Sequence, residues 1–293
     1  MNLPQRREIM RIIAGIVLFN PEIKRLRENL DAIHGQVDKV LLVDNASENV
    51  EEVEMFLKEY ANAYLIKNEK NEGIAYALNQ ILRFAQKEKA EWFITLDQDS
   101  VCKQDLVTVY RKYTKIENVA MMTCQIRDRN FTERKRTGEQ KEYNFVTYCI
   151  TSGSFVNTRL CKECGGWDER LFIDNVDGDI CINFKIHGYR VLCINYEGLL
   201  HEVGQGRNVH FLWVKGCVYN HPPFRHYFIA RNHIYVARKY PGEYRLIDEI
   251  KRELRSISQI LLFEKEKKAK MAARMKGVKD GLRMGIEGEN IHG

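Results

Sequence analysis

Apolar and amphipathic segments alternate through the first half of this 293-residue chain, and this pattern constrains its fold most strongly. Four short apolar runs, each typical of a buried strand, are followed by segments whose apolar residues have helical spacing. The predicted strands are residues 11–19, 38–44, 63–68 and 91–97, and the predicted helices are residues 22–33, 50–60, 74–87 and 104–115. Such alternation favours a doubly wound α/β domain, with a mostly parallel sheet covered on both faces. Further strands are predicted at residues 119–126 and 145–156.

The segments at the ends of the four predicted strands all contain polar residues. These segments are Phe19-Asn20-Pro21, Asp44-Asn45-Ala46-Ser47, Asn68 to Gly73, and Asp97-Gln98-Asp99. Ligands of doubly wound sheets bind beyond the carboxyl ends of the strands, so we expect these groups to converge. The chain has no Gly-x-Gly-x-x-Gly after its first strand and no Gly-Lys-Ser/Thr loop, which counts against a dinucleotide dehydrogenase and a P-loop enzyme.

Two acids one residue apart, Asp97 and Asp99, end the fourth predicted strand. In an extended segment they point to the same side, so that both can contact one cation. The alternative is an ordinary turn, because Asp and Ser often end strands by bonding the local backbone. These residues alone leave both interpretations open.

The C-terminal region carries much of the chain's net charge of +6. Between Arg245 and Arg283 there are twelve Lys or Arg and six Asp or Glu, interleaved with apolar residues at helical spacing. Such a tail suits an anionic membrane surface, or a solvated helix packed on the main domain. No basic-aromatic motif indicates nucleic-acid binding. We expect an α/β domain over residues 1–205 and a basic helical extension over residues 206–293.

Composition bounds the class of protein. The chain is 44% hydrophobic, which supports a substantial core. Its eight scattered cysteines favour an intracellular protein with free thiols over a disulfide framework. No segment approaches the ~18 consecutive apolar residues of a membrane span. We therefore expect a cytoplasmic protein, with possible peripheral contact at the inner face of the membrane.

Seven motifs span nearly the whole chain in a fixed order: "VLFNP", "LLVDNAS", "NEGIAYALNQ", "FITLDQDS", "ITSGSFV", "FIDNVDGDICINFKIHGY" and "RNHIYVARKY". In this order they resemble glycosyltransferase family 2, and more narrowly its bacterial rhamnosyltransferase-like branch. The resemblance implies a GT-A fold and an inverting, metal-dependent enzyme that transfers rhamnose from dTDP-rhamnose to a cell-surface glycan or its lipid-linked precursor. A UDP-linked galactofuranose, glucose or N-acetylglucosamine is the alternative donor.

The resemblance also implies a donor site. Phe19 and Asn20 would border the nucleotide, Asp44 would bind the base or ribose, and Asn71 and Gly73 would line the donor pocket. The alternative for Asp44 and Asn71 is a capping role. Gly73 alternatively permits close helix approach or an unusual backbone conformation.

In the resembling family an Asp-x-Asp motif holds magnesium or manganese on the diphosphate of the donor. By that match Asp99 is the stronger ligand candidate, and Asp97 acts through water or on the ribose. His201, in "LLHEVG", matches a position that completes the metal or phosphate site, with a structural role as the alternative. Arg231 either pairs with phosphate or lies on a solvated helix.

The same resemblance places the general base at Asp177, which would take the proton of the acceptor hydroxyl. The family's preceding Glu is replaced here by Val176, and Asp179 is the less favoured base. An Asp at the start of a helix is also an ordinary cap.

The resemblance also implies an acceptor side, formed by Ser152, Gly153, Trp167 and Asp179. Trp167 either stacks on a sugar face or fills the core. The Gln-x-x-Arg-Trp motif of processive synthases is missing, which favours the addition of a single sugar. Two other classes stay open: a nucleotidyltransferase, although "VLFNPEIKR" lacks its glycine-rich loop, and a catalytically silent binding module that does not need Asp177.

Overall fold

The computed structural model describes residues 10–128, 141–201, 207–211 and 214–286. The chain divides into two compact units. The first contains residues 1–167 and 180–202, and the second contains residues 168–179 and 203–293. The second unit therefore takes in a twelve-residue segment that the sequence assigned to the α/β domain. A domain boundary after residue 205 stays a prediction.

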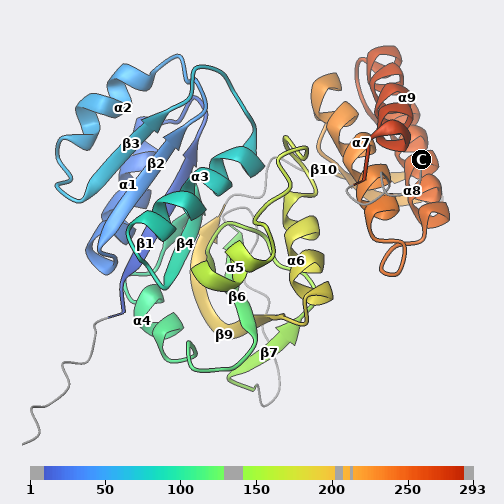
Figure 1. The fold of residues 1–293 in the computed structure, drawn as a ribbon. Coiled ribbons are helices and arrows are strands. Elements are labelled where there is room, and N and C mark those ends of the chain that lie inside the picture. Colours follow the sequence, from blue (N-terminus) through green and yellow to red (C-terminus); the bar gives the residue numbers. More distant parts are fainter. Residues whose placement is uncertain (1–9, 129–140, 202–206, 212–213, 287–293) are drawn as a thin grey trace, which may run out of the picture. The chain divides into compact units, whose positions relative to one another are not determined.

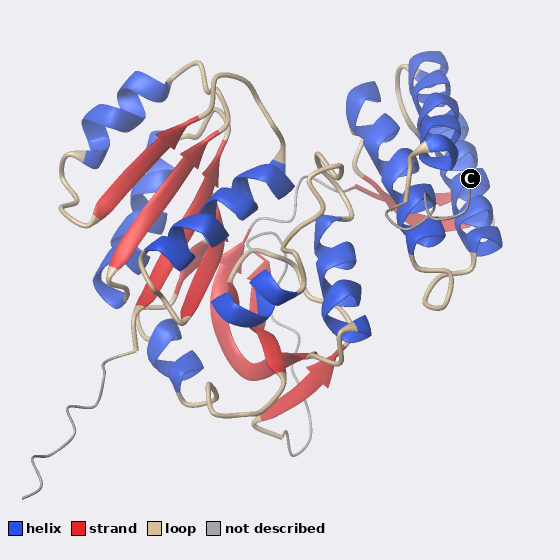
Figure 2. Cartoon of the chain, in the orientation of Figure 1, coloured by secondary structure: helices blue, strands red, loops and turns tan. Residues whose placement is uncertain are grey.

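The first unit is built on a nine-stranded mixed sheet (Figures 1 and 2). Its strands are β1 (Ile12–Leu18), β2 (Lys39–Asp44), β3 (Ala63–Lys67), β4 (Trp92–Asp97), β5 (Val101–Cys102), β6 (Val119–Asp128), β7 (Tyr143–Val146), β8 (Ser154–Asn157) and β9 (Arg190–His201). The order β3-β2-β1-β4-β8-β6-β9-β5 has parallel pairs from β3 to β4 and an antiparallel β8 beside β4, with β7 pairing β9. The four strand ends named above therefore lie at one edge of the sheet.

Four helices follow the first four strands as the apolar spacing predicted: α1 (Ile23–Ile33), α2 (Val50–Leu57), α3 (Ile74–Lys87) and α4 (Leu106–Arg111). The structure adds α5 (Thr158–Glu163), α6 (Val176–Ile186) and a short 3₁₀ turn η1 (His34–Gln36) after α1. The doubly wound α/β prediction is confirmed for this half of the chain. Residues 145–156 are not one strand, because β7 and β8 are separated by a turn that contains Gly153 at φ 75°.

The two faces of the sheet are covered by different helices. Ile12, Ala14 and Ile16 of β1 share a core with apolar residues of α1, α2 and α4. Gly15 points to the other face, where α3 packs so closely that a Cβ at this position would lie 2.3 Å from a methyl carbon of Ile81. The absence of a side chain at Gly15 therefore sets how near α3 lies to β1.

The second unit contains a two-stranded hairpin and three helices. The elements are β10 (Arg207–Phe211), β11 (Val214–Val218), α7 (Pro223–Lys239), α8 (Leu246–Phe263) and α9 (Lys267–Arg283). Gly277 and Gly281 let α9 lie directly on α7, since a Cβ at either position would be 2.4 Å from a backbone oxygen of α7. Within the described part of the chain, no helix has the length and apolar content needed to cross a membrane.

Candidate active-site residues

The ends of β1 and β4 are joined by the middle residue of the Asp-x-Asp motif. The backbone N–H of Phe19 donates to Oε1 of Gln98 at 2.8 Å, and Nε2 of Gln98 donates to the carbonyl of Phe19 at 3.2 Å. Gln98 and Asp99 lie in a turn after β4, in which the N–H of Ser100 bonds the carbonyl of Asp97, so the turn held open for this stretch is present and strand alternation does not extend to Asp99. Phe19 is itself 49% exposed, which suits a residue at the border of a ligand site.

Asp44 lies at the end of β2 with 1% of its surface exposed. Its Oδ2 accepts a hydrogen bond from the backbone N–H of Ser47 at 2.9 Å, which closes a local turn. This bond is not the helix cap given as the alternative, because the residue at the N-cap position of α2 is Asn49. Its Oδ1 is buried and has no hydrogen-bond partner among the described residues. A buried acceptor without a donor costs about 1–3 kcal/mol, so this oxygen is suited to a donor supplied by a ligand.

The neighbouring loops are fixed by side-chain to backbone hydrogen bonds. The hydroxyl of Ser47 accepts from the backbone N–H of Asn20, which has a left-handed φ of 48°. Oδ1 of Asn71 accepts from the backbone N–H of Gly73 at 3.0 Å, and Gly73 precedes α3 with a φ of 89°. Asn71 therefore closes a local turn and is not itself the cap of α3, because the residue at that N-cap position is Gly73, which supplies a conformation that other residues rarely adopt.

The backbone of Asp97 is held from three directions. Its N–H donates to Oγ of Ser152 at 3.0 Å, and its carbonyl accepts from Nδ2 of Asn29 at 2.7 Å and from the N–H of Ser100 at 3.1 Å. Ser152 is 2% exposed and also bonds the hydroxyl of Ser100 at 2.8 Å. Ser152 therefore orders the Asp-x-Asp backbone, and its burial does not support the expected contact with an acceptor.

Asp97 and Asp99 are both partly exposed beyond the edge of the sheet. Magnesium is commonly held by one or two carboxylates together with phosphate oxygens of a substrate, so this pair fits such an ion. Among the described residues, no three His, Cys, Asp or Glu side chains converge as a complete protein site. The backbone of His201 ends β9 opposite Asp128, but its side chain lies outside the described part of the structure.

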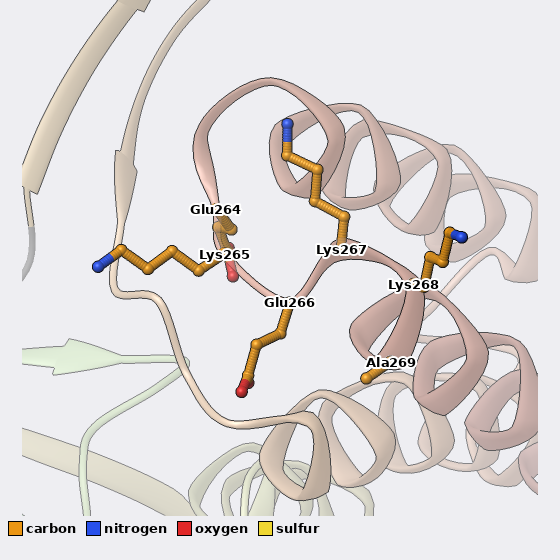
Figure 3. A pocket seen from close by; sticks show the side chains of 6 residues that line it. All are labelled: Glu264, Lys265, Glu266, Lys267, Lys268 and Ala269. Carbon is orange, nitrogen blue, oxygen red and sulfur yellow. The ribbon is translucent and has the colours of Figure 1, made fainter.

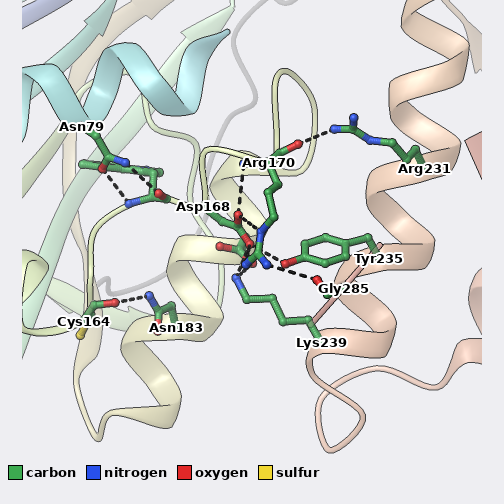
Figure 4. Close-up of polar contacts among 11 residues, drawn as sticks. Asn79, Cys164, Asp168, Arg170, Asn183, Arg231, Tyr235, Lys239 and Gly285 are labelled. Atoms are coloured by element: carbon green, nitrogen blue, oxygen red, sulfur yellow. Dashed lines mark hydrogen bonds and ion pairs between the residues drawn. The ribbon is translucent and has the colours of Figure 1, made fainter. Parts of the chain in front are cut away.

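Side chains of α7 hold the segment 168–179 in the second unit (Figure 4). Asp168 accepts hydrogen bonds from the hydroxyl of Tyr235 at 2.7 Å and from Nζ of Lys239 at 2.9 Å. The same ammonium bonds Oδ1 of Asp179 at 2.7 Å. Burial alone would raise the pKa of Asp168, but hydrogen bonds from Arg170 and Lys239 hold that pKa well below its usual range.

The turn before α6 is fixed by the same helix. Nδ2 of Asn232 donates to the carbonyls of Ile173 and Asp174 at 2.7 and 2.8 Å. The carboxylate of Asp174 pairs with Arg225 at 3.0 Å. Asp174 and Asn175 both have positive φ values, 67° and 61°, and such pairs are uncommon without outside support. The consequence is a defined start for α6, whose first turn contains Asp177.

Asp177 and Asp179 have different surroundings. Asp177 is partly exposed in the first turn of α6. Asp179 is 1% exposed and ion-paired with Lys239, and burial raises its pKa against the opposing charge of that lysine. Asp179 is therefore a structural residue of the second unit, and the expected acceptor-side role is not supported for it.

Two further expectations are not supported by the packing. Trp167 is 3% exposed, its backbone N–H and carbonyl bond the amide of Asn79 at 2.9 and 2.8 Å, and its ring meets the edge of Phe93. It fills the core and offers no face to a sugar. Arg231 bonds the carbonyl of Arg170, and its guanidinium lies 4.5 Å from the ring centre of Phe228. Burial lowers the pKa of Arg231. Its guanidinium already has partners within the second unit, so the expected contact with a phosphate is not supported.

Sequence reasoning missed Asn232 and Lys239 as residues that hold the segment with Asp177. Both lie in the motif "RNHIYVARKY", which contributed to the family resemblance but gave neither residue a role. Tyr235 and Lys239 are four residues apart and so share one face of a helix. Their partner Asp168 is 71 residues away from Lys239, and no local pattern indicates that pairing.

Comparison with known proteins identifies the family of the chain. Residues 14–174 match the family described as Glycosyl transferase family 2. The dTDP-rhamnosyl transferase RfbF of Shigella flexneri is 29% identical over 298 aligned residues, covering 94% of this chain and 97% of the relative.

Solved structures show the same fold at low sequence identity. Residues 1–349 of S. aureus TarS, in complex with UDP-GlcNAc, align with a TM-score of 0.63 and 13% identity, covering 94% of this chain and 81% of that chain. A structure of GalNAc-T7 with UDP, GalNAc and Mn²⁺ aligns with a TM-score of 0.60 and 15% identity, covering 94% of this chain and 56% of that chain. The chain spans 44% of a longer TarS structure. With its GT-A fold and its likeness to a rhamnosyl transferase along nearly its full length, the chain belongs to glycosyltransferase family 2.

Proposed function

We propose that this glycosyltransferase transfers a single rhamnose from dTDP-rhamnose, with inversion, to a bacterial cell-surface glycan or its lipid-linked precursor. The donor is supported by the rhamnosyl transferase RfbF, which matches over 94% of this chain. The observation that supports the nucleotide site is the buried Oδ1 of Asp44, which no described residue satisfies. A base N–H or ribose hydroxyl would supply the missing donor.

In the proposed mechanism Phe19 and Asn20 border the nucleotide, and Asn71 and Gly73 shape the loop beside it. Asp99, helped by Asp97, holds magnesium or manganese. When bound, the ion neutralises charge on the departing diphosphate. The carboxylates are presented by a backbone that Ser152, Asn29 and Gln98 hold in place. That ordering reduces the entropy lost when the ion and the donor bind.

Asp177 is the proposed general base. The acceptor oxygen attacks the anomeric carbon, its proton passes to the carboxylate of Asp177, and the bond from that carbon to the diphosphate oxygen breaks. The nucleoside diphosphate leaves, and one displacement inverts the configuration. The support is the position of Asp177 on a partly exposed first helical turn, whereas Asp179 is buried in an ion pair.

A panel of nucleotide sugars tests this proposal. Purified protein is incubated with dTDP-rhamnose, UDP-galactofuranose, UDP-glucose or UDP-N-acetylglucosamine, with magnesium or manganese, and the released nucleotide is measured. We expect the fastest release from dTDP-rhamnose and a loss of release when the metal is chelated. Nucleotide binding with no release from any donor, whatever acceptor extract is added, would favour the catalytically silent module.

A UDP-linked donor is the second candidate. It is supported by the fold shared with TarS, a structure solved in complex with UDP-GlcNAc. We also propose a peripheral location at the inner face of the membrane, supported by the basic composition of the C-terminal helices and the lipid-linked class of acceptor.

A further inference from the structure

Helix α8 carries apolar side chains on its exposed face and acids on its buried face. Glu249 and Glu253 are each 4% exposed, whereas Ile247, Ile250 and Leu254 are 47%, 41% and 61% exposed. A helix of a globular protein normally has the opposite arrangement. The apolar stripe continues along the same face through the half-buried Ile257 and the exposed Leu261, at spacings of three and four residues. An exposed stripe of this length indicates an interaction surface.

Helix α9 extends the apolar surface beside α8. Met275 is 65% exposed and Leu282 is 46% exposed, and Val278 lies between them on the same helical face. A groove of about 430 Å³ runs between the two helices, lined by apolar side chains from both and by Ile234 of α7. Glu253 is the acid of α8 that lines this groove, and its charge is neutralised by Arg274, which donates two hydrogen bonds of 2.8 Å to it.

Cations lie at this groove. Lys279 and Arg283 line it, and Arg255 follows Leu254 on α8; all three side chains are exposed. Lys265 in the turn between α8 and α9, and Lys267 and Lys268 at the start of α9, add three lysines beside two acids, Glu264 and Glu266. Figure 3 shows these residues around a hollow of about 510 Å³. An apolar stripe with exposed cations beside it is typical of helices that lie in a membrane interface.

We propose that the surface formed by α8 and α9 docks on an anionic phospholipid bilayer, with lipid chains entering the groove. Charge favours this occupant over a second copy of the chain, because two copies meeting through this face would bring the same cations together. The inference rests on the proposed membrane location and specifies its surface. It does not depend on the identity of the donor sugar.

Vesicle flotation of the full-length protein tests the proposal. We compare vesicles of phosphatidylcholine with and without phosphatidylglycerol, and we expect binding only to the anionic vesicles, weakened by salt. Leu254→Glu places a charge at the centre of the stripe, and we expect at least about a tenfold loss of partitioning. The matched control is Met55→Glu on α2, because Met55 is 63% exposed and lies outside the second unit.

A second variant tests the charge separately. Arg255→Gln combined with Lys279→Gln should lower partitioning about thirtyfold, since each basic residue near an anionic surface contributes about 1 kcal/mol. Equal binding of Leu254→Glu and Met55→Glu, or no vesicle binding by the unaltered protein, would overturn the proposal. A concentration-dependent dimer that Leu254→Glu dissociates, without vesicle binding, would assign the surface to a second copy. Nucleotide release measured without vesicles tests the transfer reaction independently.

Discussion

Replacing Lys239 by Met removes the shared cation of two buried carboxylates. Lys239 bonds Asp168 at 2.9 Å and Asp179 at 2.7 Å, and these two side chains are 6% and 1% exposed. Asp168 keeps its bonds from Arg170 and Tyr235, but Asp179 loses the opposite charge that its burial requires. We therefore expect the contact between α7 and the first turn of α6 to weaken at Asp179, two residues after Asp177, while Asn232 and Arg225 keep their bonds to the preceding turn.

The expected cost follows from the burial of the pair. Removing one partner of a buried ion pair typically costs about 3–5 kcal/mol. Lys239 is 18% exposed, and Asp179 can take up a proton in the variant, so we expect about 3 kcal/mol. For a unit of this size such a loss lowers the midpoint of thermal unfolding by roughly 10–20 °C.

The pH dependence gives a second signature. Without Lys239 the pKa of Asp179 in the folded state rises further above the unfolded value, because burial is then unopposed. A raised folded pKa means that stability is greatest below the unfolded value of about 3.9 and is lost as pH rises toward the folded pKa. The deficit of Lys239→Met relative to the unaltered protein should therefore shrink as pH is lowered from 7 to 5.

Thermal melts followed by circular dichroism, and nucleotide release, measure these effects. The control is Lys251→Met, because Lys251 and its partner Asp248 are 69% and 52% exposed and 3.6 Å apart. We expect Lys239→Met to lower kcat while nucleotide binding, which we assign to residues of the first unit, stays unchanged. Equal melting temperatures for Lys239→Met and Lys251→Met, with unchanged kcat, would refute the assigned role of Lys239.

Three shorter predictions follow. Asp99→Asn should weaken metal binding more than Asp97→Asn in a titration with manganese, and comparable losses would refute that order. Burial lowers the folded pKa of His226, so the stability of the second unit should be full above pH ~6.5 and fall as pH drops below it. The melting temperature of His226→Gln should vary less between pH 7.5 and 5.5, and an unchanged slope would exclude this titration. Gly15→Ala should destabilise the first unit by about 1–3 kcal/mol in urea unfolding, because its Cβ would overlap Ile81, and a neutral result would contradict that packing.

The first half of the fold could be predicted because its information is local. Each strand is an apolar run, and the residues that matter at its end, such as Asp44 and Asp97, follow it directly in sequence. Parallel pairing then brings those ends to one edge without further assumptions.

The second half could not be predicted in the same way. The position of Asp168 depends on Lys239, which lies 71 residues later, and no periodicity links the two. The burial of Ser152, Trp167 and Arg231 favours structural roles for them, and the sequence could not show that burial because their residue types occur in active sites and in cores. The assignment of residues 168–179 to the C-terminal unit therefore depends on long-range contacts that only the structure shows.

The measurement that tests the central claim most directly is single-turnover transfer by Asp177→Asn, alongside dTDP binding by calorimetry. Asn keeps the size of the side chain but cannot accept the acceptor proton, and a general base typically contributes about 10²–10⁴-fold to the rate. We predict a rate lowered by about that factor, with unchanged dTDP affinity and an unchanged melting temperature. Transfer at the unaltered rate would contradict the assignment of Asp177 as the base of this glycosyltransferase.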